Sequence, residues 1–357
     1  MKKQIYLEYA FGIADKIWET YQATREQSIE EGRQALRKEG VLSSPLRYLA
    51  TVPPAEVRRY RQTGDVRYLD RAKSYLLDIY DVYLTLRTYQ EEQHLRIEND
   101  DFPTLGWMFE PEPYISAYNS IRAEVEFSEE ERAKIEKVVE LSLAPIRKMP
   151  EYGPMNRSIL RALNLAAAGA SFPDHPDAAR WLKMGRHMFA DSLDKWSMED
   201  AGSYQGIWLY SFIAYNDYVP TVAIAESPVV KYYADLWARL VTPIGFIPDY
   251  GDWDLGSDWV HIAAVMERCA TMYRSGRLKY AVNRYTQAHA AIDVGLTGGI
   301  SRFLQQLISA HDWADDDLIE QEPTTGSQEI CDDTIGKKCV LRSGWARHST
   351  YLLLNYR

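Results

Sequence analysis

Hydrophobic residues recur every three or four positions over most of the first 311 residues. In residues 5–21 this pattern is formed by Leu7, Ala10, Phe11, Ala14, Ile17, Trp18 and Tyr21. The spacing places these side chains on one face and predicts an amphipathic α-helix. Similar patterns predict further helices at about 66–92, 129–147, 156–170, 175–196, 203–217, 227–242, 258–275, 277–292 and 299–311.

Proline and glycine residues separate these helical segments. Examples are Pro53-Pro54, Pro111 with Pro113, Gly153-Pro154, Pro220 and Pro243. Both residue types interrupt regular helices. Because many helices of similar length are joined by short connections, the pattern favours stacked antiparallel helix pairs. Such pairs either close into an α/α toroid or remain an open solenoid.

The pattern changes after residue 311. Residues 312–323 are acidic and residues 324–337 are polar, as expected of a linker with a solvated run of charge. Residues 338–345 and 349–357 read as two β-strands joined by a turn. An isolated hairpin is at best marginally stable in water. We therefore expect these strands either to dock on the helical body or to begin a β-domain that continues beyond residue 357.

The composition indicates a globular protein and limits the classes of ligand. The chain is 46% hydrophobic and 26% charged, and it contains 25 Tyr and 10 Trp. Such aromatic residues suit a sugar or peptide cleft, although core packing accounts for most of them. The net charge of −10 disfavours nucleic acid as a partner, and it requires any site for an anionic substrate to be locally basic.

The N-terminus and the cysteines predict neither a targeting segment nor a cofactor. The first ten residues lack an apolar signal-peptide core, so the sequence as written predicts a cytoplasmic protein, or a periplasmic one if a leader has been removed. No apolar run approaches the roughly 20 residues of a membrane span. Three cysteines are too few for a disulfide framework, and no Cys/His cluster has zinc spacing. We predict no metal and no cofactor, and the sequence gives no prediction of the oligomeric state.

The first segment with candidate chemistry is residues 153–157, which open a predicted helix. Asn156 and Arg157 place an amide, a guanidinium and free backbone N–H groups together, and this combination binds carboxylates. The alternative is that Asn156 is only the N-cap and Arg157 lies on the surface. Position alone favours that alternative.

Two further segments are candidates. In residues 198–211 a turn precedes Tyr204, Gln205, Trp208 and Tyr210 at the start of the next helix, although a core position is the common fate of a Tyr such as Tyr210. Residues 243–254 combine two prolines, two glycines, three carboxylates and three aromatics, which predicts a rigid functional loop. From this loop and the helix after it we take as candidate substrate-binding residues Tyr250, Asp252, Trp253 and His261. The loop has no EF-hand pattern, which argues against calcium.

In their order these segments resemble the heparinase II/III-like family of polysaccharide lyases, which includes oligoalginate lyases. The resemblance covers roughly residues 100–357 and rests on a set of short motifs. They are Asn156 at the family's carboxylate-neutralising Asn, Phe172-Pro173-Asp174 with Ala178 and Trp181, Asp200-Ala201-Gly202 before Tyr210 at the catalytic Tyr, Ile247-Pro248-Asp249-Tyr250-Gly251-Asp252, and Val340-Leu341-Arg342-Ser343-Gly344-Trp345.

The resemblance implies a mainly α fold, an incomplete (α/α) toroid followed by the beginning of an antiparallel β-sandwich domain. The implied domains are a toroid at 1–311, a linker at 312–337 and the first sandwich strands at 338–357. It also implies cleavage of uronic-acid-containing glycans, heparin/heparan-sulfate-like or alginate-like, by β-elimination. The expected partner is therefore an anionic polysaccharide or oligosaccharide.

Elimination requires that the uronate carboxylate be neutralised while the C5 proton is removed. Asn156 would bind the carboxylate with Arg157 nearby, and Tyr204, Gln205 and Trp208 would help bind substrate. Tyr210 is the candidate for proton transfer, and acting as a base would need a lowered pKa. In the family a His from the β-domain completes the catalytic set. His348, in the turn of the terminal hairpin, is not expected to supply it.

The sequence departs from the family at Arg157 and Ser211, where His is frequent, and at Gln205, where Glu is frequent. Two alternatives therefore remain. One is a glycoside hydrolase on a similar toroid, of the unsaturated glucuronyl hydrolase type, with paired carboxylates from Asp249, Asp252 and Asp254. The other is a non-catalytic uronate-binding module, and fold analogy alone does not separate them.

Overall fold

The structure is a computed structural model. It describes residues 3–40, 46–96, 110–148, 150–193, 202–221, 223–248, 259–291, 304–323 and 338–355. Among these residues no helix is long and apolar enough to cross a membrane.

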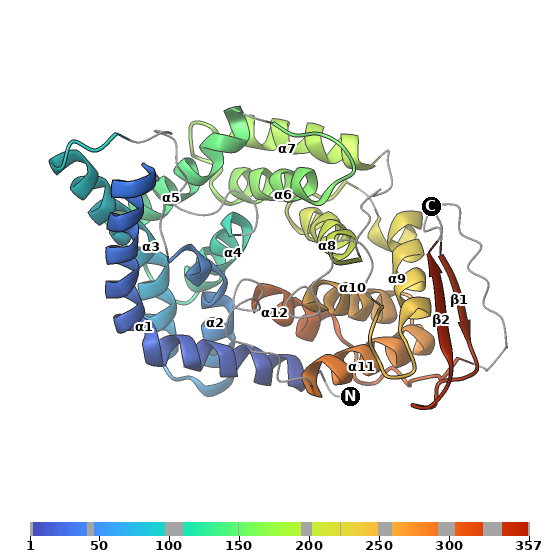
Figure 1. Ribbon diagram of the computed structural model, residues 1–357. Helices are drawn as coiled ribbons and strands as arrows, with labels where there is room; N and C mark the ends of the chain where they lie inside the picture. The colour runs from blue at the N-terminus through green and yellow to red at the C-terminus, as the bar shows by residue number, and fades with distance from the viewer. Residues whose placement is uncertain are drawn as a thin grey trace.

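Helices α1 to α12 follow one another along the chain and form antiparallel pairs (Figure 1). Their bounds are α1 (Gln4–Glu39), α2 (Pro53–Thr63), α3 (Arg67–Glu92), α4 (Pro111–Ile121), α5 (Glu129–Lys148), α6 (Asn156–Ser171), α7 (Ala178–Leu193), α8 (Gly202–Tyr218), α9 (Pro228–Leu240), α10 (Trp259–Met272), α11 (Gly276–Ala291) and α12 (Leu304–Trp313). Short 3-10 helices precede α2 at Arg47–Thr51 and α9 at Ile224–Glu226. Strands β1 (Lys338–Arg342) and β2 (Tyr351–Asn355) complete the fold.

The even-numbered helices form the inner layer of a ring. Each packs against the next in the series, from α2 through α4, α6, α8 and α10 to α12, and α12 also contacts α1 and α2. In Figure 1, α4, α8, α10 and α12 surround the middle of the molecule, while α1, α7 and α9 lie at its periphery. The expected fold class is confirmed: the chain is mainly α, an incomplete toroid of helix pairs followed by an antiparallel pair of strands.

Prolines begin two helices that the sequence pattern did not predict. Pro53 and Pro54 occupy the first turn of α2, and Pro111 and Pro113 the first turn of α4. The sequence pattern predicts these prolines to lie in breaks between helices. That interpretation is wrong at both positions, because a proline in the first turn removes only an N–H that has no intrahelical partner.

Helix α1 is longer than its hydrophobic pattern, with 36 residues instead of the predicted 17 (5–21). Beyond Tyr21 the residues are mostly Gln, Glu, Arg and Ala, which favour a helix even where little apolar surface is buried. The helix ends where Gly40 adopts a left-handed conformation with φ of 62°.

A small residue lets two inner helices approach closely beside the candidate site. Gly206 in α8 faces α10, and a Cβ placed on it would lie 2.7 Å from Ile262 Cγ1. A side chain at that distance requires Ile262 or one of the two helices to shift. Gly206 therefore fixes the α8–α10 spacing one turn before Tyr210.

A buried polar cluster joins the first helix to the last pairs of the ring. The Tyr6 hydroxyl donates to Glu267 Oε1 at 2.8 Å and lies 3.0 Å from Thr286 Oγ1. Lys279 Nζ lies 2.9 Å from Glu267 Oε2, and both side chains are buried. The ion pair joins α10 to α11, and Tyr6 links α1 to it by a hydrogen bond; removing either charge would leave the other buried and unpaired.

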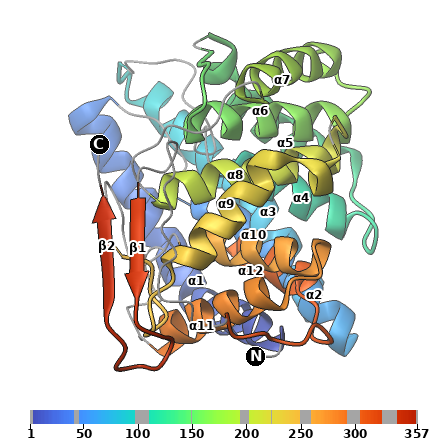
Figure 2. The ribbon, with the colours of Figure 1, turned by 90° about the vertical axis from the view of Figure 1, so that its right-hand side faces the viewer.

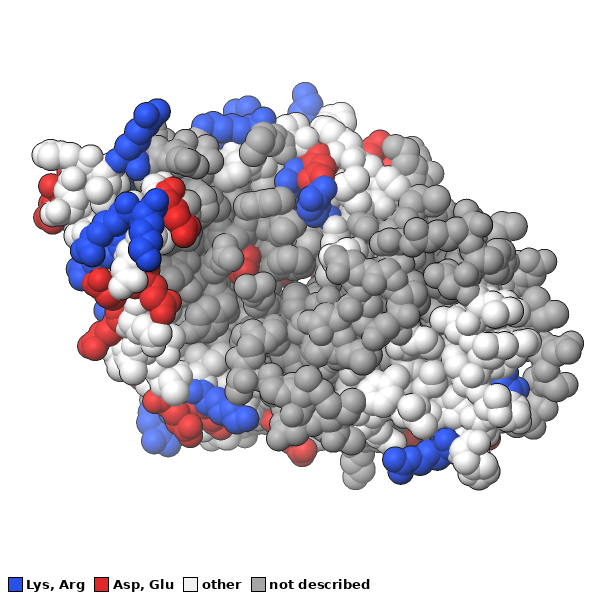
Figure 3. Space-filling model, in the orientation of Figure 1, with Lys and Arg blue, Asp and Glu red and all other residues white. Residues whose placement is uncertain are grey.

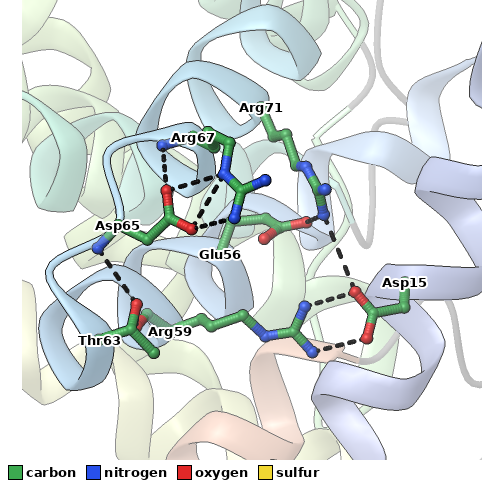
Figure 4. Close-up of polar contacts among 7 residues, drawn as sticks. All are labelled: Asp15, Glu56, Arg59, Thr63, Asp65, Arg67 and Arg71. Atoms are coloured by element: carbon green, nitrogen blue, oxygen red, sulfur yellow. Dashed lines mark hydrogen bonds and ion pairs between the residues drawn. The ribbon is translucent and has the colours of Figure 1, made fainter.

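A second cluster joins α1, α2 and α3 (Figure 4). Arg59 donates to both carboxylate oxygens of Asp15, and Arg71 lies 3.8 Å from the same carboxylate. Glu56 is fully buried behind them, and its Oε1 lies 4.0 Å from Arg71 Nη1. Burial raises the pKa of Glu56 to about 7, and the arginines only partly oppose this.

The β-hairpin docks on the outer helix α9, as Figure 2 shows. Val340 pairs with Leu353 and Arg342 with Tyr351 in the antiparallel register. The Tyr351 hydroxyl donates to the Leu240 carbonyl at 2.9 Å, and Arg342 donates to the Arg239 carbonyl. Docking, the first of the two outcomes expected for these strands, is thus observed.

Candidate functional site

A pocket of 420 Å³ lies between α4, α8 and α12 in the middle of the ring. Most of its lining is polar, and the lining residues are Arg61, Glu112, Ser116, Asn119, Ser120, Tyr210, Ala214, Asp217, Tyr218, Gln305, Ser309 and Trp313. Tyr210 is the only residue in this lining that the sequence had marked as a site candidate. The volume is within the range typical of small-ligand sites.

Tyr210 is held from three sides. Its hydroxyl forms a 2.9 Å hydrogen bond with Ser309 Oγ of α12, and its side chain is only 3% exposed. Its ring meets His261 edge-on and Trp313 at a tilt, each with 5.6 Å between ring centroids. Burial raises the pKa of Tyr210 above its ordinary value, and the negative charge of Glu112 raises it further. The phenol therefore keeps its proton at neutral pH.

Glu112 is a site residue that the sequence analysis missed. It lies in the first turn of α4, it is 6% exposed, and its Oε1 accepts a 2.7 Å hydrogen bond from Tyr218. Its backbone N–H donates to Asn164 Oδ1 of α6 at 3.1 Å, which anchors the start of α4. Burial raises the pKa of Glu112 to about 7. The sequence did contain a signal for Glu112, because it is a carboxylate between Pro111 and Pro113. Prolines mark the first turn of a helix, and a side chain in that turn has a fixed direction.

The charges at the mouth of the pocket are partly paired. Asp217 is exposed, and partial desolvation raises its pKa while Arg268 opposes the shift. Arg61 Nε donates to Glu124 Oε1 at 3.0 Å, and the Arg268 guanidinium lies 5.6 Å from the Trp313 ring. The pocket therefore combines two carboxyl groups with one lining cation that already has a carboxylate partner.

Asn156 and Arg157 lie outside this pocket, at the start of α6. Met155, with extended backbone, occupies the N-cap, so Asn156 is the first helical residue instead of the cap. Asn156 Oδ1 accepts from the Arg157 backbone N–H at 2.7 Å. Arg157 Nη2 lies 2.7 Å from Glu151 Oε1, and Arg161 Nη1 lies 2.9 Å from Glu151 Oε2. The Arg157 guanidinium is thus already paired.

Among the other candidates that the structure describes, His261 contacts the ring of Tyr210. Trp208 is fully buried, and its ring stacks on Phe212 at 5.3 Å between centroids. Gln205 is 8% exposed and His261 is 1% exposed. Tyr204 is half-buried. Five loop residues lie outside the described residues: Asp249, Tyr250, Asp252, Trp253 and Asp254.

A second pocket, of 660 Å³, lies against α11 and the turn of the β-hairpin. It is lined in part by Arg284, Gln287, Glu320 and Arg347. Figure 3 shows that, on the face drawn, described charges of both signs alternate along the edge formed by α1 and α3. Within the described part of the chain, no group of three His, Cys, Asp or Glu residues could hold a metal ion.

Comparisons with known proteins support the fold. The chain matches no protein-family model and no curated protein. Among solved structures it is similar to that of heparinase III, with a TM-score of 0.52 and 17% sequence identity. The match covers 86% of this chain and 44% of heparinase III, so the chain spans less than half of that protein. At this identity the likeness shows a heparinase-like, polysaccharide-lyase-like fold.

Proposed function

We propose that this chain carries the toroid of a polysaccharide lyase that cleaves uronic-acid-containing glycans, heparin/heparan-sulfate-like or alginate-like, by β-elimination. The observation that carries the proposal is the placement of Tyr210. It lies in the central pocket of a toroid similar to that of heparinase III. The resemblance of the sequence to heparinase II/III-like lyases selects the same tyrosine.

In this proposal Tyr210 is the proton donor. Elimination removes the C5 proton, forms the C4–C5 double bond and breaks the C4–O4 bond, and the departing O4 needs a proton. Because burial raises the pKa of Tyr210, the phenol is suited to giving that proton and unsuited to acting as the base. Ser309, at 2.9 Å, fixes the direction of the hydroxyl.

We propose that Asn156 binds the uronate carboxylate through its amide. The N-terminus of α6 adds backbone N–H groups and a favourable dipole for an anion. Arg157 would contribute only if it exchanged Glu151 for the substrate. This requirement makes the ion pair with Glu151 part of the proposed binding equilibrium.

We further propose that residues 338–357 are the first strands of a β-sandwich domain, after a toroid at 1–311 and a linker at 312–337. The hairpin supports this through its outward face. Leu352 and Leu354 are 47% and 49% exposed and project from the side opposite to Leu353, which packs toward the core. A two-stranded sheet with an apolar outer face gains stability from further strands or a second sheet.

A second candidate is a glycoside hydrolase, and one specific observation favours it. Glu112 and Asp217 line the same pocket, and burial raises the pKa of Glu112 to about 7, as in a carboxylic general acid. Hydrolysis would release reducing ends without forming an unsaturated sugar. The two candidates therefore differ in product and not only in rate.

The test is absorbance at about 235 nm, where the unsaturated uronate absorbs, during incubation of the protein with uronate polymers. We expect the absorbance to rise with wild-type protein and to stay flat with Tyr210→Phe. Tyr215→Phe is the matched control, because Tyr215 is a fully buried tyrosine on the same helix and lies outside the pocket lining. Reducing ends without absorbance would favour the hydrolase, and no product on any polymer would refute both.

A further inference from the structure

The second pocket, of 660 Å³, lies where three parts of the chain meet, and it shares no lining residue with the central pocket. One face of α11 forms a wall through Tyr280, Asn283, Arg284, Gln287 and Ala288, which recur every three or four positions. The turn after α9 and the turn of the β-hairpin add further lining. In Figures 1 and 2 this hairpin turn lies beside α11.

Two close contacts hold these walls in place. Gly245 adopts φ of 97°, and a Cβ placed on it would lie 2.5 Å from the Arg284 carbonyl oxygen. Glycine thus allows the turn after α9 to pack directly on the backbone of α11. On the hairpin side, the Trp345 ring meets Tyr280 edge-on, with 5.4 Å between ring centroids. This contact fixes the hairpin turn that brings Arg347 to the pocket.

Arg284 is held in position by neutral acceptors. Its Nε donates to the Tyr280 hydroxyl at 2.8 Å, and its Nη1 donates to the Pro243 carbonyl. Among the described residues Arg284 forms no ion pair, and its Nη2 has no hydrogen-bond partner. The side chain is half-buried, while Nη2 is not fully buried. A guanidinium that is oriented, partly desolvated and without a counter-ion favours binding of an anion.

The lining of this pocket carries a surplus of one positive charge. Arg347 is exposed and, within the described part of the chain, has no hydrogen-bond or ion-pair partner. Glu320 is the one carboxylate among the lining residues, and its Oε1 accepts from Asn283 Nδ2 at 2.6 Å. Two arginines and one carboxylate leave one positive charge to be balanced, which matches a ligand with a single negative charge.

Much of the remaining lining is apolar. Ile244 is 55% exposed, Phe246 and Ala288 are half-buried, and all three line the pocket. Because apolar surface gains from being covered by another apolar surface, this wall suits an organic ligand better than a bare inorganic anion.

We propose that this pocket binds a small organic carboxylate. The carboxylate pairs with Arg284 and Arg347, and the body of the ligand packs on Ile244 and Phe246. Glu320 is the neighbouring negative charge that limits the affinity. The site is independent of the proposed lyase activity, because Tyr210 does not line this pocket. Acidic sugars and apolar acids share the chemistry that it recognises.

The experiment uses two acids and their uncharged counterparts, namely benzoate with benzamide and methyl β-glucuronide with methyl β-glucoside. Binding to the full chain is measured at low salt by isothermal titration calorimetry and saturation-transfer NMR. We expect millimolar binding of at least one acid, with its uncharged counterpart at least about tenfold weaker. Stronger binding of benzoate identifies an apolar acid, and stronger binding of the glucuronide an acidic sugar. Equal affinities within both pairs, or no binding of either acid at about 100 mM, would overturn the proposal.

Variants locate the binding and test its sign. Arg284→Met should weaken binding of the acid about tenfold or more, with urea unfolding as the check on folding because Arg284 also holds the Pro243 carbonyl. Arg347→Gln changes only an exposed side chain and should weaken binding about threefold. Glu320→Gln removes a negative charge and should strengthen binding about threefold. Arg180→Gln is the matched control, since Arg180 is an exposed arginine on α7, and it should have no effect.

The same variants separate this site from the proposed uronate contact at Asn156. Glucuronide bound at Asn156 would be insensitive to both Arg347→Gln and Glu320→Gln, and that result would overturn the assignment. An effect of Arg180→Gln as large as that of Arg347→Gln would also overturn it, because it would show a non-specific effect of net charge. Failure of the absorbance test for elimination has no bearing on these measurements, since neither acid contains a bond between two sugars.

Discussion

Glu56 should make the stability of the protein depend on pH in a defined direction. It is 0% exposed, and burial raises its pKa from 4.5 to about 7 (Figure 4). In the folded state the Glu56 carboxyl thus holds its proton up to about pH 7. In the unfolded chain it loses that proton near the ordinary Glu pKa. Between these two pKa values the folded state binds more protons, so the free energy of unfolding falls as pH rises.

The magnitude follows from the shift. Each pKa unit corresponds to about 1.4 kcal/mol, so a shift of this size is worth roughly 3 kcal/mol. This contribution is fully present below the unfolded pKa and is lost as pH rises through about 7. Glu56→Gln keeps the shape and abolishes the titration. The difference in unfolding free energy, wild type minus variant, should therefore fall by roughly 3 kcal/mol between about pH 4.5 and pH 8.

The assay is reversible urea unfolding followed by circular dichroism at several pH values. Taking the difference between wild type and Glu56→Gln cancels the contribution of Glu112, whose pKa is also raised to about 7. Glu131→Gln is a control of opposite sign. Desolvation opposes the shift, but hydrogen bonds from Lys73 and Ser128 lower the pKa of Glu131. The contribution of Glu131 to the free energy of unfolding should stay constant above the ordinary Glu pKa and be lost only at lower pH.

A flat difference between wild type and Glu56→Gln over this range would refute the reasoning. It would mean that Glu56 is ionised in the folded state and that Arg71 and Arg59 compensate for its burial. A difference that rises with pH would mean that the arginines more than compensate.

Three further changes test the packing, each by urea unfolding at one pH. Gly206→Val should destabilise the protein by about 1–3 kcal/mol, because its Cβ would meet Ile262 at 2.7 Å; an unchanged midpoint would contradict the α8–α10 contact. Lys279→Met should cost about 3–5 kcal/mol by leaving Glu267 buried and unpaired, and adding Glu267→Gln should recover part of it. Trp208→Ala should lower the free energy of unfolding by about 3–5 kcal/mol, because Trp208 is a fully buried core residue. Loss of glycan binding with normal stability would contradict this and would support the sequence prediction that Trp208 binds substrate.

The sequence pattern predicted which segments are helical more reliably than which residues face the centre of the ring. Periodicity reports that one face is buried, and it found α1, α3 and α5 to α12 in this way. It did not find α2 and α4, since prolines at a helix start look like prolines between helices. It also did not distinguish Trp208 from Tyr210, two residues apart on α8. Trp208 enters the aromatic core with Phe212, while Tyr210 reaches the pocket.

That distinction depends on the partner helix and not on local sequence. An inner helix of a toroid is covered on the outside by the outer helix of its antiparallel pair. The neighbouring inner helices cover both of its sides, so nearly all its positions are buried. In α6, residues Ile159 to Gly169 are all buried, apolar and polar alike. A polar residue on such a helix is therefore the informative signal, because burial requires it to have a partner or a ligand. Asn164 is an example, because its Oδ1 accepts from the Glu112 backbone N–H at the start of α4.

The same burial that defines the centre of the ring also sets its acid–base chemistry. It raises the pKa of Glu112 to about 7 and the pKa of Tyr210 and Tyr218 above their ordinary values, so both tyrosines hold their protons at neutral pH and Glu112 is protonated in part. The two tyrosines can donate protons and hydrogen bonds but are unsuited to removing a weakly acidic C5 proton. Within the described residues, the pocket thus supplies the acid half of an elimination. The proposed lyase would then need its base, and its main contact with the uronate carboxylate, at the end of the ring where α6 begins with Asn156.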